Sequence, residues 1–178
     1  MPGADPRAMS HSWLFTGPPG SGRSLAAIDF AAALMCTDPE EPGCGRCEAC
    51  RAVLDTKQHT DLVLVDPQEV IIPVDTVREV IGRAASLPTV APWRVVIFNN
   101  ADRLNNNGAN ALLKTVEEPP ARTVIIMCAP SDAPEDFSQT LRSRCRHLYI
   151  PSPSVESITA QLVSEGASDH DAHLAALT

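Results

Sequence analysis

A glycine-rich segment near the start of the chain places the strongest constraint on its fold. It reads Gly17-Pro18-Pro19-Gly20-Ser21-Gly22-Arg23-Ser24 and separates an apolar, strand-like run at 12–16 from an Ala-rich, helix-like run at 25–35. This context is typical of a phosphate-binding loop, in which backbone N–H groups converge on phosphate oxygens and the following helix adds its positive end. The sequence therefore predicts a nucleotide-binding strand–loop–helix unit whose candidate residues are Gly17, Gly20, Ser21, Gly22, Arg23 and Ser24.

Two departures from that pattern argue against ATP hydrolysis. Arg23 stands where the pattern has a lysine, and its planar fork cannot take the lysine's place between the β- and γ-phosphates without readjustment. Asn99 and Asn100 stand where an ATPase of this architecture has an acidic pair that orders Mg²⁺ and polarises water. Amides cannot accept a proton and bind Mg²⁺ weakly, so we expect hydrolysis to be severely impaired or absent. Asp102 is expected only to solvate a helix entrance, and binding of ATP or ADP stays open.

Four of the six cysteines form a cluster in the sequence, with the pattern C-x7-C-x2-C-x2-C at Cys36, Cys44, Cys47 and Cys50. In a reducing compartment such a cluster favours a metal ion over disulfides. Four thiolates suit tetrahedral zinc and leave no open position for water, which predicts a structural site. Two disulfides or free thiols are the alternative. Cys128, in an apolar strand-like run, reads as a small core residue.

Strand-like and helix-like runs alternate along the chain. The predicted strands are 12–16, 62–65, 94–98, 123–129 and a last one ending at Ile150, and the predicted helices are 25–35, 48–56, 74–86 and one that ends at 117–120. Such alternation predicts an α/β fold, with a parallel sheet flanked by helices on both faces and the glycine-rich loop at the carboxyl ends of the strands.

Length and composition limit the domain organisation and the function classes. A chain of 178 residues with 44% hydrophobic residues suffices for one full core and the start of another domain. We expect an extended or disordered N-terminus at 1–10, a core at 11–150 with the cysteine module at 36–50, and a partial helical domain at 151–178. No apolar run reaches membrane-spanning length and no signal core is present, which predicts a cytoplasmic protein. The net charge of −8 argues against a dedicated nucleic-acid binder, but not against a local basic patch.

Three other polar features of the sequence could suggest catalysis or ligand binding, but structural or surface roles explain them as well. His59 is expected to cap a turn or lie on the surface, because four cysteines already suffice for a metal. Glu117 and Glu118 do not form a catalytic pair, because adjacent helical residues point about 100° apart, and a solvated helix end is expected. The basic run at 142–147 forms a solvated face or presents a guanidinium to a neighbouring subunit's phosphate.

Several stretches of the sequence occur together in one known family. They are Gly17 to Gly22, the four clustered cysteines, His59-Thr60-Asp61, the run Asn110-Ala111-Leu112-Leu113-Lys114-Thr115-Val116-Glu117-Glu118-Pro119-Pro120, and Ser143-Arg144-Cys145. The last two are specific together, whereas the loop alone is not. On these residues, which span most of 11–150, the chain resembles the delta-prime subunits of the bacterial DNA polymerase III clamp loader, within the AAA+ clamp-loader family that includes gamma/tau.

The resemblance implies a RecA-like AAA+ core that carries a zinc module and is followed by the start of a helical lid. Arg144 matches the family's arginine finger, which reaches ATP bound by an adjacent gamma/tau subunit. Lys114 lies on the helix that matches the family's interior helix facing the sheet. The implied partners are the gamma/tau and delta subunits and, through the assembly, the sliding clamp and primed DNA.

This sequence departs from the family pattern in several places. The first cysteine gap is one residue shorter, and the polar sensor-1 position falls around Pro130-Ser131 and is blurred. The segment that contacts adenine ahead of the first strand is replaced by 1–10. The chain stops within the lid, and both a fragment and a short paralogue fit this.

The leading hypothesis is a non-hydrolysing clamp-loader subunit that acts in trans through Arg144. One alternative is an active AAA+ ATPase resembling gamma/tau, against which Asn99 and Asn100 argue. Another is a zinc-dependent DNA-binding module, which the acidic net charge disfavours.

Overall fold

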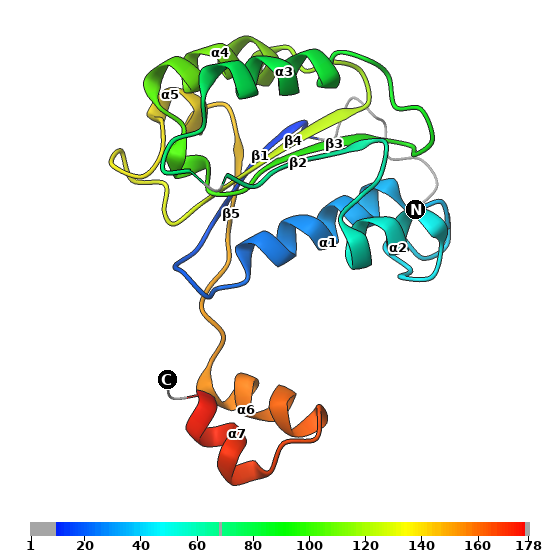
Figure 1. The fold of residues 1–178 in the computed structure, drawn as a ribbon, viewed down its shortest axis with the longest axis vertical. Helices are drawn as coiled ribbons and strands as arrows, with labels where there is room; N and C mark the ends of the chain where they lie inside the picture. Colours follow the sequence, from blue (N-terminus) through cyan, green and yellow to red (C-terminus); the bar gives the residue numbers. More distant parts are fainter. Residues whose placement is uncertain (1–9, 68, 177–178) are drawn as a thin grey trace.

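The centre of the molecule is a five-stranded sheet in a computed structural model that describes residues 10–67 and 69–176 (Figure 1). The strands are β1 (Ser12–Thr16), β2 (Leu62–Val65), β3 (Arg94–Phe98), β4 (Thr123–Ala129) and β5 (Arg146–Tyr149). They pair in the order β2-β3-β4-β1-β5, and each of these pairings is parallel. The predicted parallel sheet is confirmed, and only the last strand ends one residue earlier than expected.

Helices cover both faces of this sheet, as predicted. One face carries α1 (Arg23–Met35) and α2 (Glu48–Arg51), which continues as the π-helical turn η1 (Ala52–Thr56). The other face carries α3 (Val74–Ala84), α4 (Asn106–Glu117) and α5 (Gln139–Arg142) (Figure 1). A 3₁₀ turn, η2 (Ala101–Arg103), leads from β3 towards α4.

Two further helices follow β5 after an extended segment and lie beyond the sheet (Figure 1). They are α6 (Val155–Ser164) and α7 (Asp169–Ala176), and they confirm the helical character expected of this part of the chain. That they begin a lid domain stays a prediction, as does the division of the chain into domains. The N-terminal segment expected to be extended or disordered lies, apart from Ser10, outside the described residues. Among the helices that the structure describes, none has the length and apolar character needed to cross a membrane.

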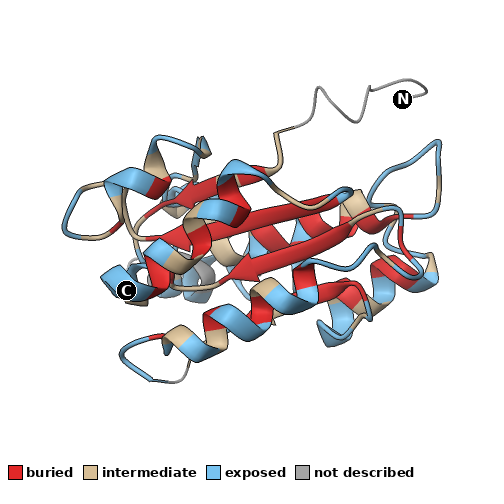
Figure 2. Cartoon of the chain, turned by 90° about the horizontal axis from the view of Figure 1, so that it is seen from above, coloured by how far each residue is buried: buried red, intermediate tan, exposed pale blue. Residues whose placement is uncertain are grey.

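The apolar core forms two layers, one on each face of the sheet. Successive side chains of a strand point to opposite faces of the sheet, and helices cover both faces. The central strands β3 and β4 are therefore buried along their whole length (Figure 2). Phe98 and Met127 belong to the layer under α3 and α4, and Phe15 and Cys128 to the layer under α1. Cys128 is fully buried, which confirms its core role, and this burial raises the pKa of its thiol to about 12.

A buried ion pair fixes the start of β2 to the start of β3. The Asp61 carboxylate, which is fully buried, accepts hydrogen bonds from Arg94 Nη2 at 2.9 Å and from the backbone N–H groups of 89–91 at 2.7–2.9 Å. Burial alone would raise the pKa of Asp61, but these backbone donors and the Arg94 guanidinium hold it well below its usual range. One carboxylate thus holds together a loop and two strands.

The same arginine also determines where α3 ends. Arg94 Nη1 donates to the carbonyl oxygens of Arg83 at 2.6 Å and Ser86 at 3.0 Å, so it satisfies carbonyls at the helix terminus that have no intrahelical partner. The predicted helix at 74–86 accordingly ends at Ala84. His59 Nδ1 accepts a hydrogen bond from the Asp61 N–H at 3.0 Å, which confirms the turn-capping role expected for this histidine.

We expect Asp61→Asn to lower the free energy of unfolding at pH 7 by about 3–5 kcal/mol, because it leaves the Arg94 charge buried and unpaired. Since the folded-state pKa of Asp61 is depressed, its contribution is present at pH values above the ordinary carboxyl pKa of about 4 and is lost as the pH falls below it. Urea denaturation at pH 7 and at about pH 2–3 measures both effects.

The matched control is Asp75→Asn, which removes an exposed ion pair with Arg78 at 3.0 Å. This change should cost less than about 1 kcal/mol, because exposed ion pairs contribute little. Equal losses in the two variants would contradict the anchoring role of Asp61.

Candidate functional site

The glycine-rich loop has the backbone shape expected of a phosphate-binding loop. It follows β1 at the carboxyl edge of the sheet, where β1 lies between β4 and β5. Gly20 and Gly22 both have φ of 82°, a left-handed conformation that residues with a Cβ rarely adopt. Gly22 is also the N-cap of α1, so the free N–H groups of the first helical turn face the loop.

Arg23, the first residue of α1, turns its guanidinium back onto this loop. Its Nη1 donates to the carbonyl oxygens of Gly17 at 2.8 Å and Pro18 at 3.0 Å. A phosphate would therefore compete with the loop's own backbone for this charge. Arg23 Nε and the Ser21 hydroxyl are buried and have no hydrogen-bond partner among the described residues.

Side chains from the ends of two strands and from the start of α1 meet beside the loop. Ser24 Oγ donates to Asn99 Oδ1 at 2.5 Å, and Asn99 Nδ2 donates to Asp66 Oδ1 at 3.1 Å. Asn99 therefore occupies the place beside Ser24 that a magnesium-binding carboxylate would need. Asn100 turns the chain away with φ of 54°, and Asp102 is exposed on the turn that follows, as expected.

The chain leaving β5 passes directly against the loop. The Ile150 N–H donates to the Thr16 carbonyl at 2.7 Å, and the Ile150 carbonyl lies against the Cα of Gly17. A Cβ added at Gly17 would overlap both this carbonyl oxygen and the Ser21 hydroxyl. Position 17 therefore requires glycine, because the Ile150 carbonyl approaches too closely to leave room for a side chain.

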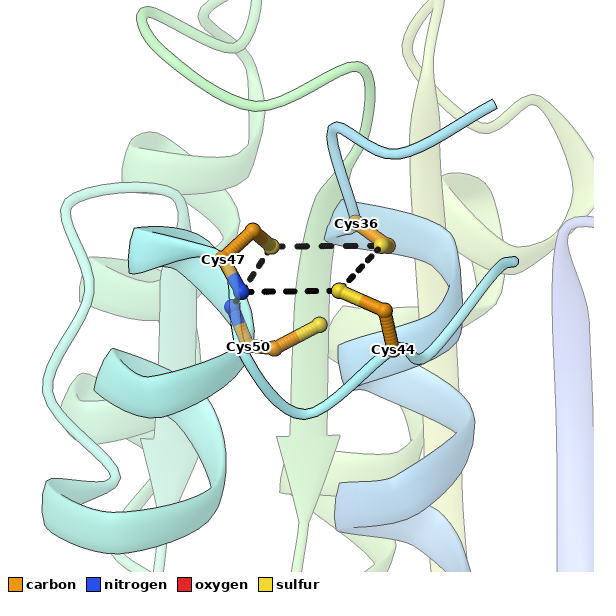
Figure 3. A group of neighbouring side chains, drawn as sticks. All are labelled: Cys36, Cys44, Cys47 and Cys50. Carbon is orange, nitrogen blue, oxygen red and sulfur yellow. Dashed lines mark hydrogen bonds between the residues drawn. The ribbon is translucent and has the colours of Figure 1, made fainter. Parts of the chain in front are cut away.

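The four clustered cysteines form a compact group of sulfurs between α1 and α2 (Figure 3). Cys36 Sγ lies 3.6 Å from Cys44 Sγ and 3.9 Å from Cys47 Sγ, and all four sulfurs lie within 4.8 Å of one another. A zinc ion with Zn–S bonds of about 2.3 Å needs sulfurs about 3.8 Å apart. The donor set and its spacing therefore fit a metal ion.

Local backbone geometry brings these sulfurs together. Gly43 and Gly45 have φ of 81° and 69°, left-handed conformations that turn the chain tightly on both sides of Cys44. Backbone N–H groups point at the sulfurs, since the Cys47 N–H donates to Cys44 Sγ and the Cys50 N–H to Cys47 Sγ, both at 3.4 Å.

The ionisation of the thiols differs within the group. Hydrogen bonds from the backbone of Thr37 and Cys50 lower the pKa of Cys47 to about 6, whereas burial raises the pKa of Cys50 to about 12. A metal ion binds the thiolate form, so Cys47 is prepared for ligation near neutral pH.

Arg144 lies at the opposite edge of the sheet from the loop. It precedes β5 and lines a surface hollow with Ser12, at the start of β1, and Glu117, at the end of α4. Because β1 is parallel to β5, the loop lies at the other end of β1, about 13 Å further along the strand. The structure thus brings the loop residues together with one another but leaves Arg144 apart from them.

The basic run at 142–147 is divided among different contacts. Arg142 Nε donates to Asp132 Oδ2 at 2.9 Å, and the Arg146 guanidinium lies over the Trp13 ring at 5.2 Å from its centroid. Arg144 Nε donates to Glu117 Oε1 at 2.6 Å, and both side chains are partly exposed. The run is therefore not a uniform solvated face.

The family of the chain follows from comparison with known proteins. The model of the family described as DNA polymerase III, delta subunit, matches residues 4–154. The chain belongs to this family. Proteins named DNA polymerase III subunit delta' from Pseudomonas aeruginosa and Escherichia coli K12 are 35% and 34% identical to it over 165 and 170 residues. These matches cover 89% and 94% of this chain but 49% and 50% of the relatives, so the chain spans about half their length.

Related subunits share the sequence pattern and the fold more distantly. A Bacillus subtilis protein named DNA polymerase III subunit tau is 29% identical over 88% of this chain and 27% of its own length. A solved DNA polymerase III gamma subunit-related protein from Thermotoga maritima superposes with a TM-score of 0.59 at 20% identity, over 88% of this chain and 49% of that one. This superposition supports the fold of the chain.

Sequence reasoning missed two residues of these sites. Asp66 accepts a hydrogen bond from Asn99, which in turn contacts Ser24. The sequence feature that could have indicated this position is the Asp-Pro pair at the end of the predicted strand 62–65. Glu117 was expected to be a solvated helix end, yet it pairs with Arg144. No local sequence pattern predicts the ion pair between Glu117 and Arg144.

We expect Gly17→Ala to lower the free energy of unfolding by about 1–3 kcal/mol, because the added methyl group overlaps the Ile150 carbonyl. The control is Gly82→Ala within α3, where a Cβ meets open space, and this change should stabilise the protein by about 0.5–1 kcal/mol. Chemical denaturation measures both, and a stabilised Gly17→Ala variant would contradict the close approach.

Proposed function

We propose that this chain is a non-hydrolysing subunit of the DNA polymerase III clamp loader, which supports ATP-dependent loading of the sliding clamp in DNA replication. Membership of the family supports the place in the assembly. The observation that carries the role is the separation of Arg144 from the chain's own loop by the length of β1. A guanidinium at that edge serves a nucleotide held by a neighbouring subunit.

In this proposal Arg144 acts in trans as an arginine finger for a gamma/tau subunit. Such a finger stabilises the charge that develops on the transferred phosphoryl group, and it needs no proton transfer of its own. The delta subunit is a further partner, and the assembly as a whole contacts the sliding clamp and primed DNA in the cytoplasm.

The chain's own loop has no hydrolytic role in the proposal. The amide of Asn99 stands beside Ser24 and Arg23 is engaged by loop carbonyls, so turnover lacks both a base and a free cation. If ATP or ADP binds, its phosphates are held by Gly17, Gly20, Ser21, Gly22, Arg23 and Ser24 without further chemistry.

We further propose that Cys36, Cys44, Cys47 and Cys50 hold a structural zinc ion. Four protein ligands leave no position for a reacting water, so the ion would stabilise the fold. It would tie the end of α1 to α2 through the 36–50 module.

Arg144→Ala should slow hydrolysis at the site that it completes by about 10³-fold, as for other arginine fingers. The rate is measured as phosphate release from the clamp loader reconstituted with gamma/tau and delta in the presence of primed DNA. Arg144→Lys should also be slow, because an ammonium does not reproduce the guanidinium fork.

Arg78→Ala is the control, since it removes an exposed arginine on α3 and should leave the rate unchanged. An unchanged rate in Arg144→Ala, or a chain that does not assemble with gamma/tau, would contradict the trans role. ATP turnover by this chain alone that is lost in Ser24→Ala would contradict the non-hydrolysing assignment.

Protein purified without chelators should contain one zinc ion per chain, and Cys47→Ser should lose it. Because metal binding energy at such sites is folding energy, the variant should also unfold at a lower temperature. Elemental analysis and thermal denaturation measure the two effects. Cys145→Ala should keep the metal, and a full zinc content in Cys47→Ser would count against the proposed ligand set.

A further inference from the structure

The guanidinium of Arg144 is held on two of its three nitrogens. Nε donates to Glu117 Oε1 at 2.6 Å, and Nη1 donates to the Thr140 carbonyl at 2.8 Å and to Ser143 Oγ at 3.1 Å. Nη2 makes no hydrogen bond within the part of the chain that the structure describes, and 37% of the side chain is exposed. One donor nitrogen therefore remains available to an incoming group.

Glu117 is fixed on a rigid element. It is the last residue of α4, and the preceding Leu112 and Val116 are buried against the sheet. The Ser12 hydroxyl of β1 also donates to the Val116 carbonyl at 3.4 Å, which ties this end of the helix to the strand. The carboxylate thus has a defined position relative to β1 and β5.

Helix stability does not explain an acid at this position. The C-terminal end of a helix carries partial negative charge, which favours a cation and disfavours a carboxylate within the last turn. The ion pair is also partly exposed, with 46% of the Glu117 side chain accessible, so it adds little to folding.

We propose that Glu117 is a positioning residue for Arg144. By holding Nε it orients the guanidinium so that Nη2 faces outward for a phosphate oxygen on the adjacent subunit. This inference rests on the proposed trans role of Arg144. A free arginine loses rotamer freedom when it binds, and a carboxylate that restrains it beforehand reduces that loss.

The opposite role, a latch that competes with phosphate, fits the contacts less well. A latch must occupy the donors that the phosphate uses, yet Glu117 takes only Nε. Among the described residues, the hollow of about 260 Å³ beside Arg144 is lined by two arginines, Arg144 and Arg146, and by one acidic residue, Glu117. Its charge therefore suits an approaching anion.

The test compares Glu117→Ala, Glu117→Gln and Glu118→Ala in the reconstituted clamp loader. Glu118 is the matched control, because it is the adjacent exposed acid and its side chain has no hydrogen bond or ion pair among the described residues. We expect Glu117→Ala to lower kcat for ATP by about 2- to 10-fold at unchanged KM, the effect of mobilising one long side chain. Glu117→Gln keeps an acceptor for Nε and should recover most of the rate, and Glu118→Ala should match the unsubstituted protein.

An unchanged or raised kcat in Glu117→Ala, an equal fall in Glu118→Ala, or no recovery in Glu117→Gln would overturn the positioning role. Arg144→Ala in the same assembly separates the two proposals. If that variant is slow while Glu117→Ala is not, only the positioning role fails. If Arg144→Ala itself has the normal rate, the proposed trans function fails.

Discussion

The hydrogen bonds that converge on the Asp61 carboxylate hold the outer part of the sheet in place. Through Arg94 they fix the end of α3, and through the backbone at 89–91 they fix the approach to β3. The register of β2 against β3 then places Asp66 and Asn99 at neighbouring strand ends beside Ser24. The buried Asp61–Arg94 network at the amino ends of the strands therefore supports the arrangement of Asp66 and Asn99 at their carboxyl ends. Such a network is costly to break because it leaves an unpaired charge behind.

The parallel sheet separates two kinds of polar site. At its carboxyl edge, the glycine-rich loop is bonded within the chain, because Arg23 donates to loop carbonyls and Ser24 donates to Asn99. At its amino edge, Arg144 keeps a donor, Nη2, that has no partner among residues 10–67 and 69–176, and it lies beside an open hollow. A single subunit cannot bring the two edges together, because a strand of fixed length lies between them. In the proposed trans role, the nucleotide that meets Arg144 is therefore held by a second subunit.

Local sequence patterns predicted the elements and the cysteine cluster well. The strands at 62–65, 94–98 and 123–129 are continuous apolar runs, and the cysteines lie within one short segment, so both signals are local. The missed contacts join distant parts of the chain. Glu117 and Arg144 are 27 residues apart, and Asp66 and Asn99 are 33 apart. Their proximity depends on a strand order that differs from the order in the sequence, and apolar periodicity carries no information about that order.

The contact between Gly17 and the Ile150 carbonyl also has a mechanical consequence. The segment that carries α6 and α7 leaves the core at this contact, with its backbone bonded to Thr16 and seated on the loop. The loop therefore contacts the segment from which the two distal helices extend, and its shape affects the path by which that segment leaves the sheet. Because Arg23 donates to two carbonyls of this loop, a side chain of the protein itself helps to hold the loop shape on which the path of that segment depends.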